Sequence, residues 1–216
     1  LKYLITPTTG LNHIDINYAN TKGVSVISLK GEDKLLKSIK STAEHTWAIL
    51  LMLIRNLDSA FKDVKNGFWR REPFLASELD GKTIGIIGYG RLGKIIAKYA
   101  DAFGMKVIAH DINSKVFLSE GINNSKINYL LSESDIITLH IPSNKENYNF
   151  IDSEKLNKLK KNVVIINTSR GEVIDEVAFL KFLQENKMAS AATDVLHGDS
   201  SWAEFSPKDN ELIKYA

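Results

Sequence analysis

The chain has no cysteine, only four prolines and no long apolar run among its 216 residues. The absence of cysteine excludes disulfides and thiolate metal sites and suits a reducing compartment, so we expect a cytoplasmic protein without a metal centre. The longest apolar stretch, residues 47–54, falls far short of the roughly 20 residues that a membrane span needs, so no membrane partner is expected.

Neither sign of charge dominates, because 28 basic and 26 acidic residues give a net charge of +2. No dense lysine or arginine block is present, so nucleic acid is not an expected partner. The first residues, "LKYLIT", carry no initiator methionine and already resemble a buried strand. We therefore expect the chain to be a fragment of a longer protein.

The first part of the chain is varied in pattern. Apolar stretches predict short strands at 2–6 and 24–29. A long helix is predicted over 41–57, with Ser41 and Glu44 spaced as in a capping box. The following stretch, 65–82, is rich in turn residues and predicts an irregular arm.

Beyond this arm, strand and helix patterns alternate. The helical stretches between the predicted strands carry apolar residues at a spacing of three and four, as in the segment from Leu92 to Phe103. This order predicts an α/β fold with a doubly wound parallel sheet. The predicted strands cover 82–88, 105–111, 135–142, 162–167 and 188–195.

The stretch "GIIGYGRLG" places Gly88, Gly90 and Gly93 between a predicted strand and a predicted helix. In a dinucleotide-binding turn the first glycine permits the turn, the second admits the pyrophosphate and the third lets the helix pack closely. Asp111 ends the next strand, where an acid accepts hydrogen bonds from a ribose. The structural alternative is a set of turn glycines and a helix-capping aspartate, and the coincidence of all these features favours a dinucleotide site.

Asp111 also favours NAD over NADP, because its carboxylate would repel a 2′-phosphate. Lys115 lies close in sequence and would soften that repulsion.

Arg170 lies just after the predicted strand that ends at Asn167, at the edge where parallel sheets bind ligands. A guanidinium at this edge offers a planar fork to carboxylate and carbonyl oxygens of a ligand. The structural alternative for Arg170 is an ion pair with a nearby acid such as Glu172.

Four motifs in this order, "GIIGYGRLG", "LHIP", "VVIINTSRGEVIDEVAFL" and "AATDV", resemble the D-isomer-specific 2-hydroxyacid dehydrogenases. The similarity runs from about Thr8 to Val195, and "TTGLNHID" resembles the substrate-domain loop of the family. The resemblance implies a Rossmann-type domain inserted into a smaller substrate domain. It assigns 1–64 to part of the substrate domain with the interdomain helix, and 65–216 to the NAD-binding domain with its connecting arm.

The resemblance also implies a set of site residues. Arg91 and Leu92 would offer backbone N–H groups to the pyrophosphate, and Asp194 would hydrogen-bond the nicotinamide carboxamide. Arg170 would bind the substrate carboxylate, with Gly10 and Leu11 beside it. The residues expected to contact NAD are Thr9, Gly88, Tyr89, Gly90, Arg91, Leu92, Gly93, Asp111, His140, Ile141, Pro142, Thr168, Ser169 and Asp194.

The acid–base pair departs from the family pattern. The position of the family glutamate holds Asp199, which we take as the catalytic carboxylate, with Glu204 as the alternative. The family histidine follows a proline, and no such context occurs before Ala216. His197 lies in the right neighbourhood without that context, so we expect the catalytic histidine beyond Ala216.

The sequence thus predicts an NAD-dependent oxidoreductase that transfers a hydride between a D-2-hydroxy acid, or its 2-keto acid, and the cofactor. The alternative is a dehydrogenase-like module that senses NAD(H) without turnover. A homodimer is expected through the helix at 41–57 and the arm at 66–74, because Phe68, Trp69 and Phe74 are large apolar groups on an irregular segment. The alternative is that these side chains fold back on their own domain.

Overall fold

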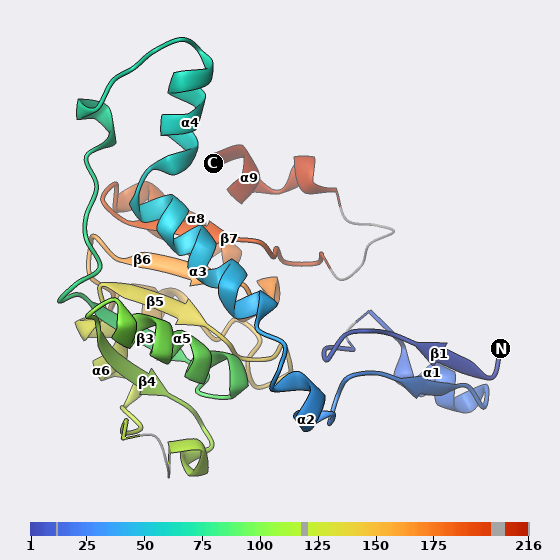
Figure 1. Ribbon diagram of the computed structural model, residues 1–216. Helices are drawn as coiled ribbons and strands as arrows, with labels where there is room; N and C mark the ends of the chain where they lie inside the picture. The colour runs from blue at the N-terminus through green and yellow to red at the C-terminus, as the bar shows by residue number, and fades with distance from the viewer. Residues whose placement is uncertain (12, 118–120, 200–205, 216) are drawn as a thin grey trace.

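The computed structural model describes residues 1–11, 13–117, 121–199 and 206–215. Two units of different size follow one another along the chain (Figure 1). The small N-terminal unit extends from one end of the larger α/β unit, and α3 lies across the sheet of the larger unit. No helix among the described residues is long and apolar enough to cross a bilayer.

The small unit consists of β1 (Tyr3–Ile5), α1 (Ile16–Thr21) and β2 (Ser25–Ile27). β1 and β2 pair in parallel, which confirms both strands predicted in this region. α2 (Asp33–Leu36) is a single helical turn that leads into α3 (Ser41–Ile54).

The long helix begins at Ser41 as predicted, but its predicted capping box and its predicted end at residue 57 are wrong. Lys40 occupies the N-cap without a side-chain hydrogen bond, so Ser41 is inside the helix and forms no capping box. The helix ends at Ile54 because Asn56 adopts a left-handed conformation with φ of 50°. α4 (Leu57–Lys65) then begins, and the arm that follows contains only a 3₁₀ turn at Glu72–Phe74.

The larger sheet has five parallel strands in the order β4-β3-β5-β6-β7. This arrangement confirms the predicted doubly wound α/β fold. The strands are β3 (Thr83–Ile87), β4 (Lys106–His110), β5 (Ile136–Leu139), β6 (Val164–Asn167) and β7 (Ser190–Thr193).

Helices cover both faces of this sheet, as the near-continuous apolar strands require. Consecutive residues of β3 point to opposite faces of the sheet. Ile86 packs with α3 and α5, while Ile87 packs with the helices on the other face. One face carries α3 and α5 (Arg91–Ala102). The other carries α6 (Ile127–Glu133), α7 (Ser153–Leu156) and α8 (Glu176–Glu185), with α9 (Glu211–Tyr215) beside α8.

The strand order reverses at β3. The chain passes from β3 to β4 on one side and then returns to β5 on the other side of β3. In open parallel sheets, ligands bind outside the carboxyl ends of the strands at such a reversal. The glycine turn that follows β3 and the segment that follows β5 therefore lie where a ligand is expected.

Candidate dinucleotide and substrate site

The three glycines after β3 occupy three different environments. Gly88 has a φ of 94°, and a β-carbon there would lie 2.5 Å from the backbone oxygen of His140. A β-carbon on Gly93 would collide with the backbone oxygen of Gly88, so this residue sets how closely α5 approaches β3. A β-carbon on Gly90 would meet nothing within 4 Å. Gly88 thus forms the turn, Gly90 leaves open space and Gly93 allows close packing, which is the arrangement that a pyrophosphate-binding turn requires.

The N-terminus of α5 begins at Arg91, directly after Gly90. Its first-turn N–H groups and its dipole favour an anion at this point. The Arg91 side chain is engaged elsewhere, because its guanidinium donates to the backbone oxygens of Leu36 at 3.2 Å and Ile39 at 2.6 Å. Arg91 therefore ties the glycine turn to the segment that joins α2 to α3.

Asp111 lies at the carboxyl end of β4, beside the glycine turn. Its Oδ2 accepts the backbone N–H of Tyr89 at 2.8 Å, and its Oδ1 accepts that of Asn113 at 2.8 Å. Each carboxylate oxygen has a second acceptor position, so the group can still receive ribose hydroxyls. The Tyr89 side chain is buried and stacks on Phe117 at 4.7 Å, so Tyr89 shapes the turn from behind.

A cavity of about 330 Å³ opens beside this turn. It brings together ten of the residues expected at the site, from the N-terminal loop, the start of α5 and the ends of β5 and β6. They are Thr9, Gly10, Arg91, Leu92, His140, Ile141, Pro142, Thr168, Ser169 and Arg170. Thr42 and Ser143 line the same cavity and were not expected from the sequence.

Asn167 holds the turn that presents Arg170. Its Oδ1 accepts both the N–H and the hydroxyl of Ser169, and its Nδ2 donates to the backbone oxygen of Arg170 at 2.9 Å. One nitrogen of the Arg170 guanidinium donates to the Ser169 oxygen at 2.6 Å. No carboxylate of the described residues lies within ion-pair distance of Arg170, so the alternative pairing with Glu172 is not formed.

His140 lines the cavity from the end of β5. Burial lowers the pKa of its imidazole to about 4, because an imidazolium would lose its hydration there. Its Nε2 lies 3.0 Å from the Thr138 hydroxyl. His140 is therefore neutral at physiological pH and contributes shape and hydrogen bonding.

Asp194 and Asp199 are among the expected residues that do not line this cavity. Asp194, at the end of β7, lines a separate groove, and its Oδ2 lies 3.1 Å from the Nε2 of His45 on α3. Partial burial raises the pKa of the Asp194 carboxyl, against the opposing effect of His45. Asp199 uses its Oδ2 to accept the N–H of Leu196 at 2.8 Å, so its carboxylate stabilises its own loop.

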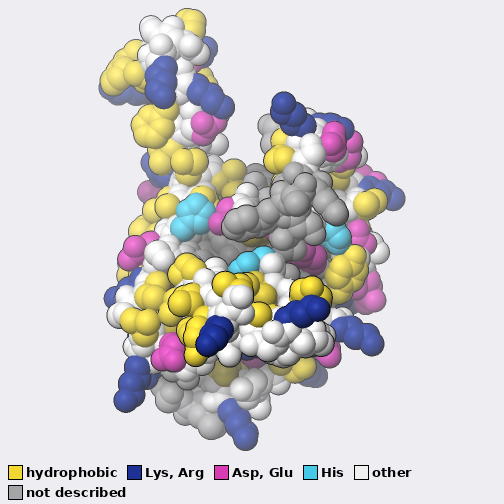
Figure 2. Space-filling view, turned by 90° about the vertical axis from the view of Figure 1, so that its right-hand side faces the viewer, with side chains coloured by type: hydrophobic (Ala, Val, Ile, Leu, Met, Phe, Trp, Pro, Cys, Tyr) yellow, Lys and Arg dark blue, Asp and Glu magenta, His cyan; other side chains and the backbone are white. Residues whose placement is uncertain are grey.

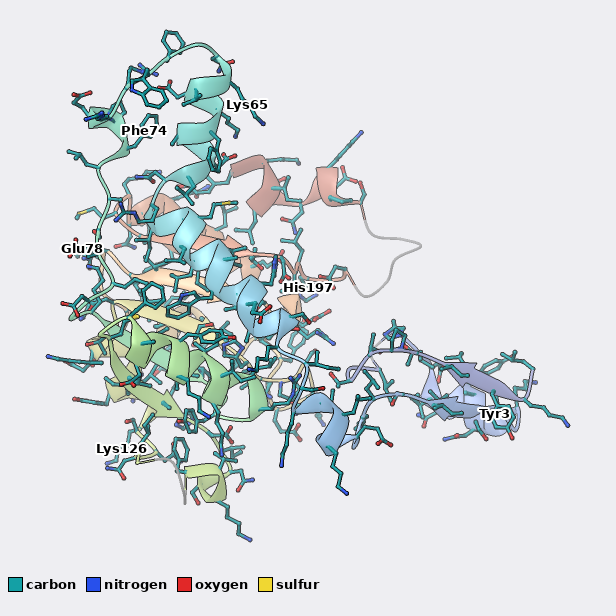
Figure 3. The ribbon with its side chains drawn as sticks, in the orientation of Figure 1. Tyr3, Lys65, Phe74, Glu78, Lys126 and His197 are labelled. Atoms are coloured by element: carbon teal, nitrogen blue, oxygen red, sulfur yellow. The ribbon has the colours of Figure 1, made fainter. Side chains whose placement is uncertain are left out.

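The remaining expectations for this region are less direct. Leu11 does not line the cavity, although its neighbours Thr9 and Gly10 do. His197 lies on the loop after β7 (Figure 3). Its ring makes a T-shaped contact with that of Tyr148, with the ring centroids 5.7 Å apart. Glu204 lies outside the described residues.

Thr46 and His45 are functional candidates that the sequence reasoning missed. The Thr46 hydroxyl lies 2.7 Å from the Thr168 hydroxyl, and both groups are buried. His45 and Thr46 both belong to the apolar helix α3, so nothing in the local sequence pattern distinguishes them from core positions.

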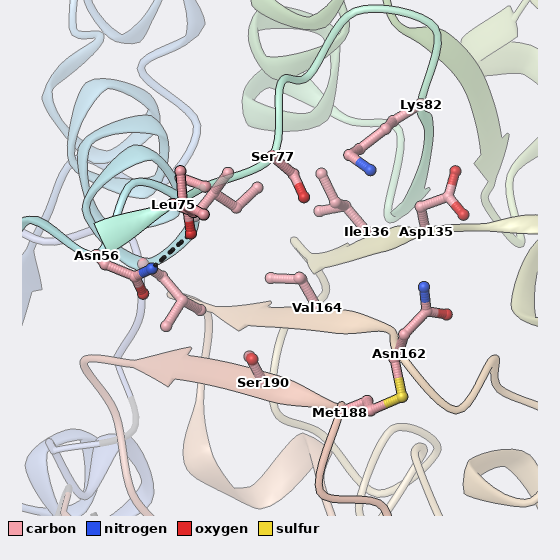
Figure 4. Close-up of a pocket in the computed structure, with 13 residues that line it drawn as sticks. Asn56, Leu75, Ser77, Lys82, Asp135, Ile136, Asn162, Val164, Met188 and Ser190 are labelled. Carbon is pink, nitrogen blue, oxygen red and sulfur yellow. Dashed lines mark hydrogen bonds between the residues drawn. The ribbon is translucent and has the colours of Figure 1, made fainter. Parts of the chain in front are cut away.

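A second cavity, of about 320 Å³, opens at the amino-terminal edge of the sheet (Figure 4). Lys82 and Asp135 lie on one side of it, and the Nδ2 of Asn56 donates to the Leu75 oxygen at 3.4 Å on the other. It is at the edge opposite to the glycine turn, so it takes no part in the dinucleotide site. Within the described ranges, no three histidine or acidic side chains gather as a metal-binding group.

The sequence profile that matches residues 47–215 describes the D-isomer specific 2-hydroxyacid dehydrogenase, NAD binding domain. The chain belongs to this family. The match covers the glycine turn, Asp111 and Arg170 together, and NAD is the cofactor that this dehydrogenase domain binds.

Individual relatives agree with this membership. D-3-phosphoglycerate dehydrogenase of Bacillus subtilis is 38% identical over 221 residues, which cover 100% of this chain and 39% of the relative. Glyoxylate reductase of Thermococcus litoralis is 36% identical over 213 residues, 94% of this chain and 63% of the relative. The chain thus spans less than two thirds of the length of these dehydrogenases and reductases.

Solved structures of the dehydrogenase fold superpose on the whole chain. D-lactate dehydrogenase from Aquifex aeolicus, complexed with NAD and lactic acid, gives a TM-score of 0.80 at 34% identity over 100% of this chain and 65% of its own. An acyclic imino acid reductase in complex with NADPH and D-Arg gives a TM-score of 0.81 at 35% identity, over 99% and 65%.

Proposed function

We propose that the full-length protein is an NAD-dependent oxidoreductase that interconverts a D-2-hydroxy acid and its 2-keto acid. The observation that carries the proposal is the position of Arg170. Its guanidinium lines the same cavity as the strand ends beside the glycine turn, and no described carboxylate neutralises it. When bound, NAD supplies the nicotinamide carbon that accepts or gives the hydride.

The residues of the chain divide the remaining work in this proposal. The turn at Gly88, Gly90 and Gly93 admits the pyrophosphate, and Asp111 receives the ribose hydroxyls. Thr168 and Asp194 receive the nicotinamide end. Arg170 holds the substrate carboxylate and polarises the C2 oxygen with its free N–H groups. Gly10 lines the cavity on the substrate side, with Leu11 next to it along the chain.

Asp199 is the proposed carboxylate of the acid–base pair. Asp199 would have to leave the N–H of Leu196 before it could support a histidine. The alternative of a non-catalytic NAD(H) sensor finds no support among the relatives, because those reported above are named dehydrogenases or reductases.

The proposal is tested with the full-length protein, NADH and a panel of 2-keto acids. Glyoxylate, pyruvate and 3-phosphohydroxypyruvate represent small, apolar and phosphorylated side groups. We expect NADH oxidation, followed by absorbance, with at least one of them. Tight NADH binding without turnover of any 2-keto acid would instead favour the sensor.

Cofactor preference provides a further prediction. Replacing Asp111 by alanine should weaken NADH binding by about 10- to 100-fold, because hydrogen bonds to a charged group are lost. It should also narrow the gap between NADH and NADPH, since the charge that repels a 2′-phosphate is removed. Fluorescence titration with both cofactors measures the two affinities.

Asp111→Asn is the matched control, because its amide oxygen can still accept the N–H of Tyr89. A wild-type protein that binds NADPH more tightly than NADH would contradict this assignment of Asp111.

We also propose a homodimer through α3, α4 and the arm at 66–74. α4 and the arm project from the α/β unit, and hydrophobic side chains gather on the projection (Figure 2). Trp69 is 80% exposed, and Phe61, Val64 and Phe68 are also exposed, which supports a contact with a second copy, whereas Phe74 is half-buried. Exposed large apolar side chains gathered on one projection support association with a partner surface.

Light scattering should therefore report a dimer at micromolar concentration, and Trp69→Asp should shift the protein to a monomer. Val177→Asp is the control, because Val177 is equally exposed but lies on α8. A wild-type monomer at micromolar concentration would be incompatible with the proposal.

We also propose that residues 1–64 belong to a substrate domain and residues 65–216 to the NAD-binding domain. The family match begins earlier than this boundary, at residue 47 inside α3. The cysteine-free composition supports a cytoplasmic location, which cell fractionation would test.

A further inference from the structure

Two consecutive side chains of α3 contact the ends of two neighbouring strands. The Thr46 hydroxyl lies 2.7 Å from that of Thr168, which follows β6. His45 Nε2 lies 3.1 Å from Asp194 Oδ2, which follows β7. β6 and β7 are adjacent and parallel, with Asn167 opposite Thr193. α3 thus backs the two strand ends that the proposed function assigns to the nicotinamide.

The hydrogen bonds of Thr46 fix the direction of its contact with Thr168. The Thr46 hydroxyl donates its single proton to the backbone oxygen of Thr42 at 2.7 Å. The proton in the Thr46–Thr168 contact must then come from Thr168, because a hydroxyl has one proton and two lone pairs. Thr46 is 2% exposed and Thr168 is 7% exposed, so solvent has little access to either side chain.

The consequence is a defined polarity on the cavity side. Thr168 lines the cavity, and its hydroxyl, whose proton is already used, offers only lone pairs and can only accept. A carboxamide carries two N–H donors and one carbonyl acceptor. An acceptor-only oxygen distinguishes the amino side of such a group from its carbonyl side.

Building on the proposed function, we propose that Thr46 is a positioning residue that turns the Thr168 oxygen into an acceptor for the carboxamide N–H of the nicotinamide. Thr46 itself touches neither cofactor nor substrate. It acts by holding the hydroxyl proton of Thr168 away from the cavity. The orientation of the carboxamide, and with it the face of the ring, is then set from α3.

The experiment compares three ligands on the full-length protein by calorimetry: NAD, its 3-acetylpyridine analogue and ADP-ribose. The analogue has a methyl group in place of the amino group, and ADP-ribose lacks the nicotinamide altogether. Wild type should bind NAD more tightly than the analogue. Thr46→Val should weaken NAD binding by about 5- to 10-fold, since the freed Thr168 proton can rotate into the cavity.

The decisive readout is the ratio of the affinities for NAD and the analogue. Thr46→Val should narrow this ratio, and Thr46→Ser, which keeps the hydroxyl, should preserve it. ADP-ribose affinity should change by less than about twofold in both variants, because the contact lies at the nicotinamide end. Thr168→Val should narrow the ratio as well, and combining it with Thr46→Val should add nothing further.

The outcomes separate the two levels of the argument. An unchanged ratio in Thr46→Val and in Thr168→Val, with ADP-ribose still bound, overturns the positioning role and leaves the proposed function standing. An equal loss of NAD and ADP-ribose in Thr46→Val identifies a purely structural contact and also overturns it. A wild-type protein that binds none of the three ligands overturns the proposed function itself. If Thr46→Val does not fold, Thr168→Val and Thr46→Ser still give the ratio.

Discussion

Replacing Arg170 by lysine in the full-length protein should lower kcat/KM for the best 2-keto acid by roughly 30- to 1000-fold. Lysine keeps the charge and loses the planar fork, so it can satisfy one substrate oxygen well but not two. The loss of a charge-assisted bidentate contact corresponds to about 2–4 kcal/mol in the transition state. NADH oxidation followed by absorbance measures the effect.

The position of Arg170 also fixes what should not change. NADH affinity should stay close to that of wild type, because the pyrophosphate cradle is built by the glycine turn and α5. Asn167 should hold the altered turn in place, since its amide bonds the backbone of Ser169 and Arg170. Turnover that survives the substitution, or a loss confined to NADH binding, would remove Arg170 from its proposed role.

Substituting alanine at Gly90 and at Gly93 should separate cofactor binding from stability. Gly93→Ala should lower the free energy of unfolding by about 1–3 kcal/mol, because the new methyl group collides with the Gly88 backbone oxygen and pushes α5 off β3. Gly90→Ala should change it by less than about 0.5 kcal/mol, since a β-carbon there meets nothing within 4 Å and the backbone has a φ of −79°.

Binding should show the reverse emphasis. The Gly90→Ala methyl group occupies the space that the pyrophosphate needs, so NADH should bind at least about tenfold more weakly. Urea denaturation and NADH fluorescence titration measure the two effects on the same preparations. A Gly90→Ala protein that binds NADH like wild type would show that the pyrophosphate does not approach this residue.

The fold was predictable because its signals are local. Each strand of the larger sheet is a short apolar run flanked by turn residues. The glycine turn is recognised from the nine residues 85–93 alone. Ten of the predicted site residues also line one cavity, eight of them because the strand order brings the carboxyl ends of β3, β5 and β6 to the same edge of the sheet.

What the sequence did not reveal depends on contacts between distant segments. Thr46 and Thr168 meet only because α3 packs across β6, and no local pattern marks that pair. Asn56 divides the expected helix through a single left-handed residue, which asparagine tolerates without requiring it. Asp199 was placed by its distance from Asp194 along the chain, whereas its carboxylate is directed by the N–H of Leu196.

The parallel sheet has a consequence for how the chain reaches its native state. All four ladders of the larger sheet are parallel, so no neighbouring strands in it are joined by a tight hairpin. The chain forms α5 between β3 and β4, so these two strands pair only after a long connection has closed. Closing such loops costs chain entropy before any pairing rewards it, which makes folding slow compared with that of a helical bundle. During this interval the β-branched run of β3 is unpaired, and such exposed strands are where partly folded chains associate. The refolding yield should therefore fall as the protein concentration is raised, at concentrations where the native protein stays in solution.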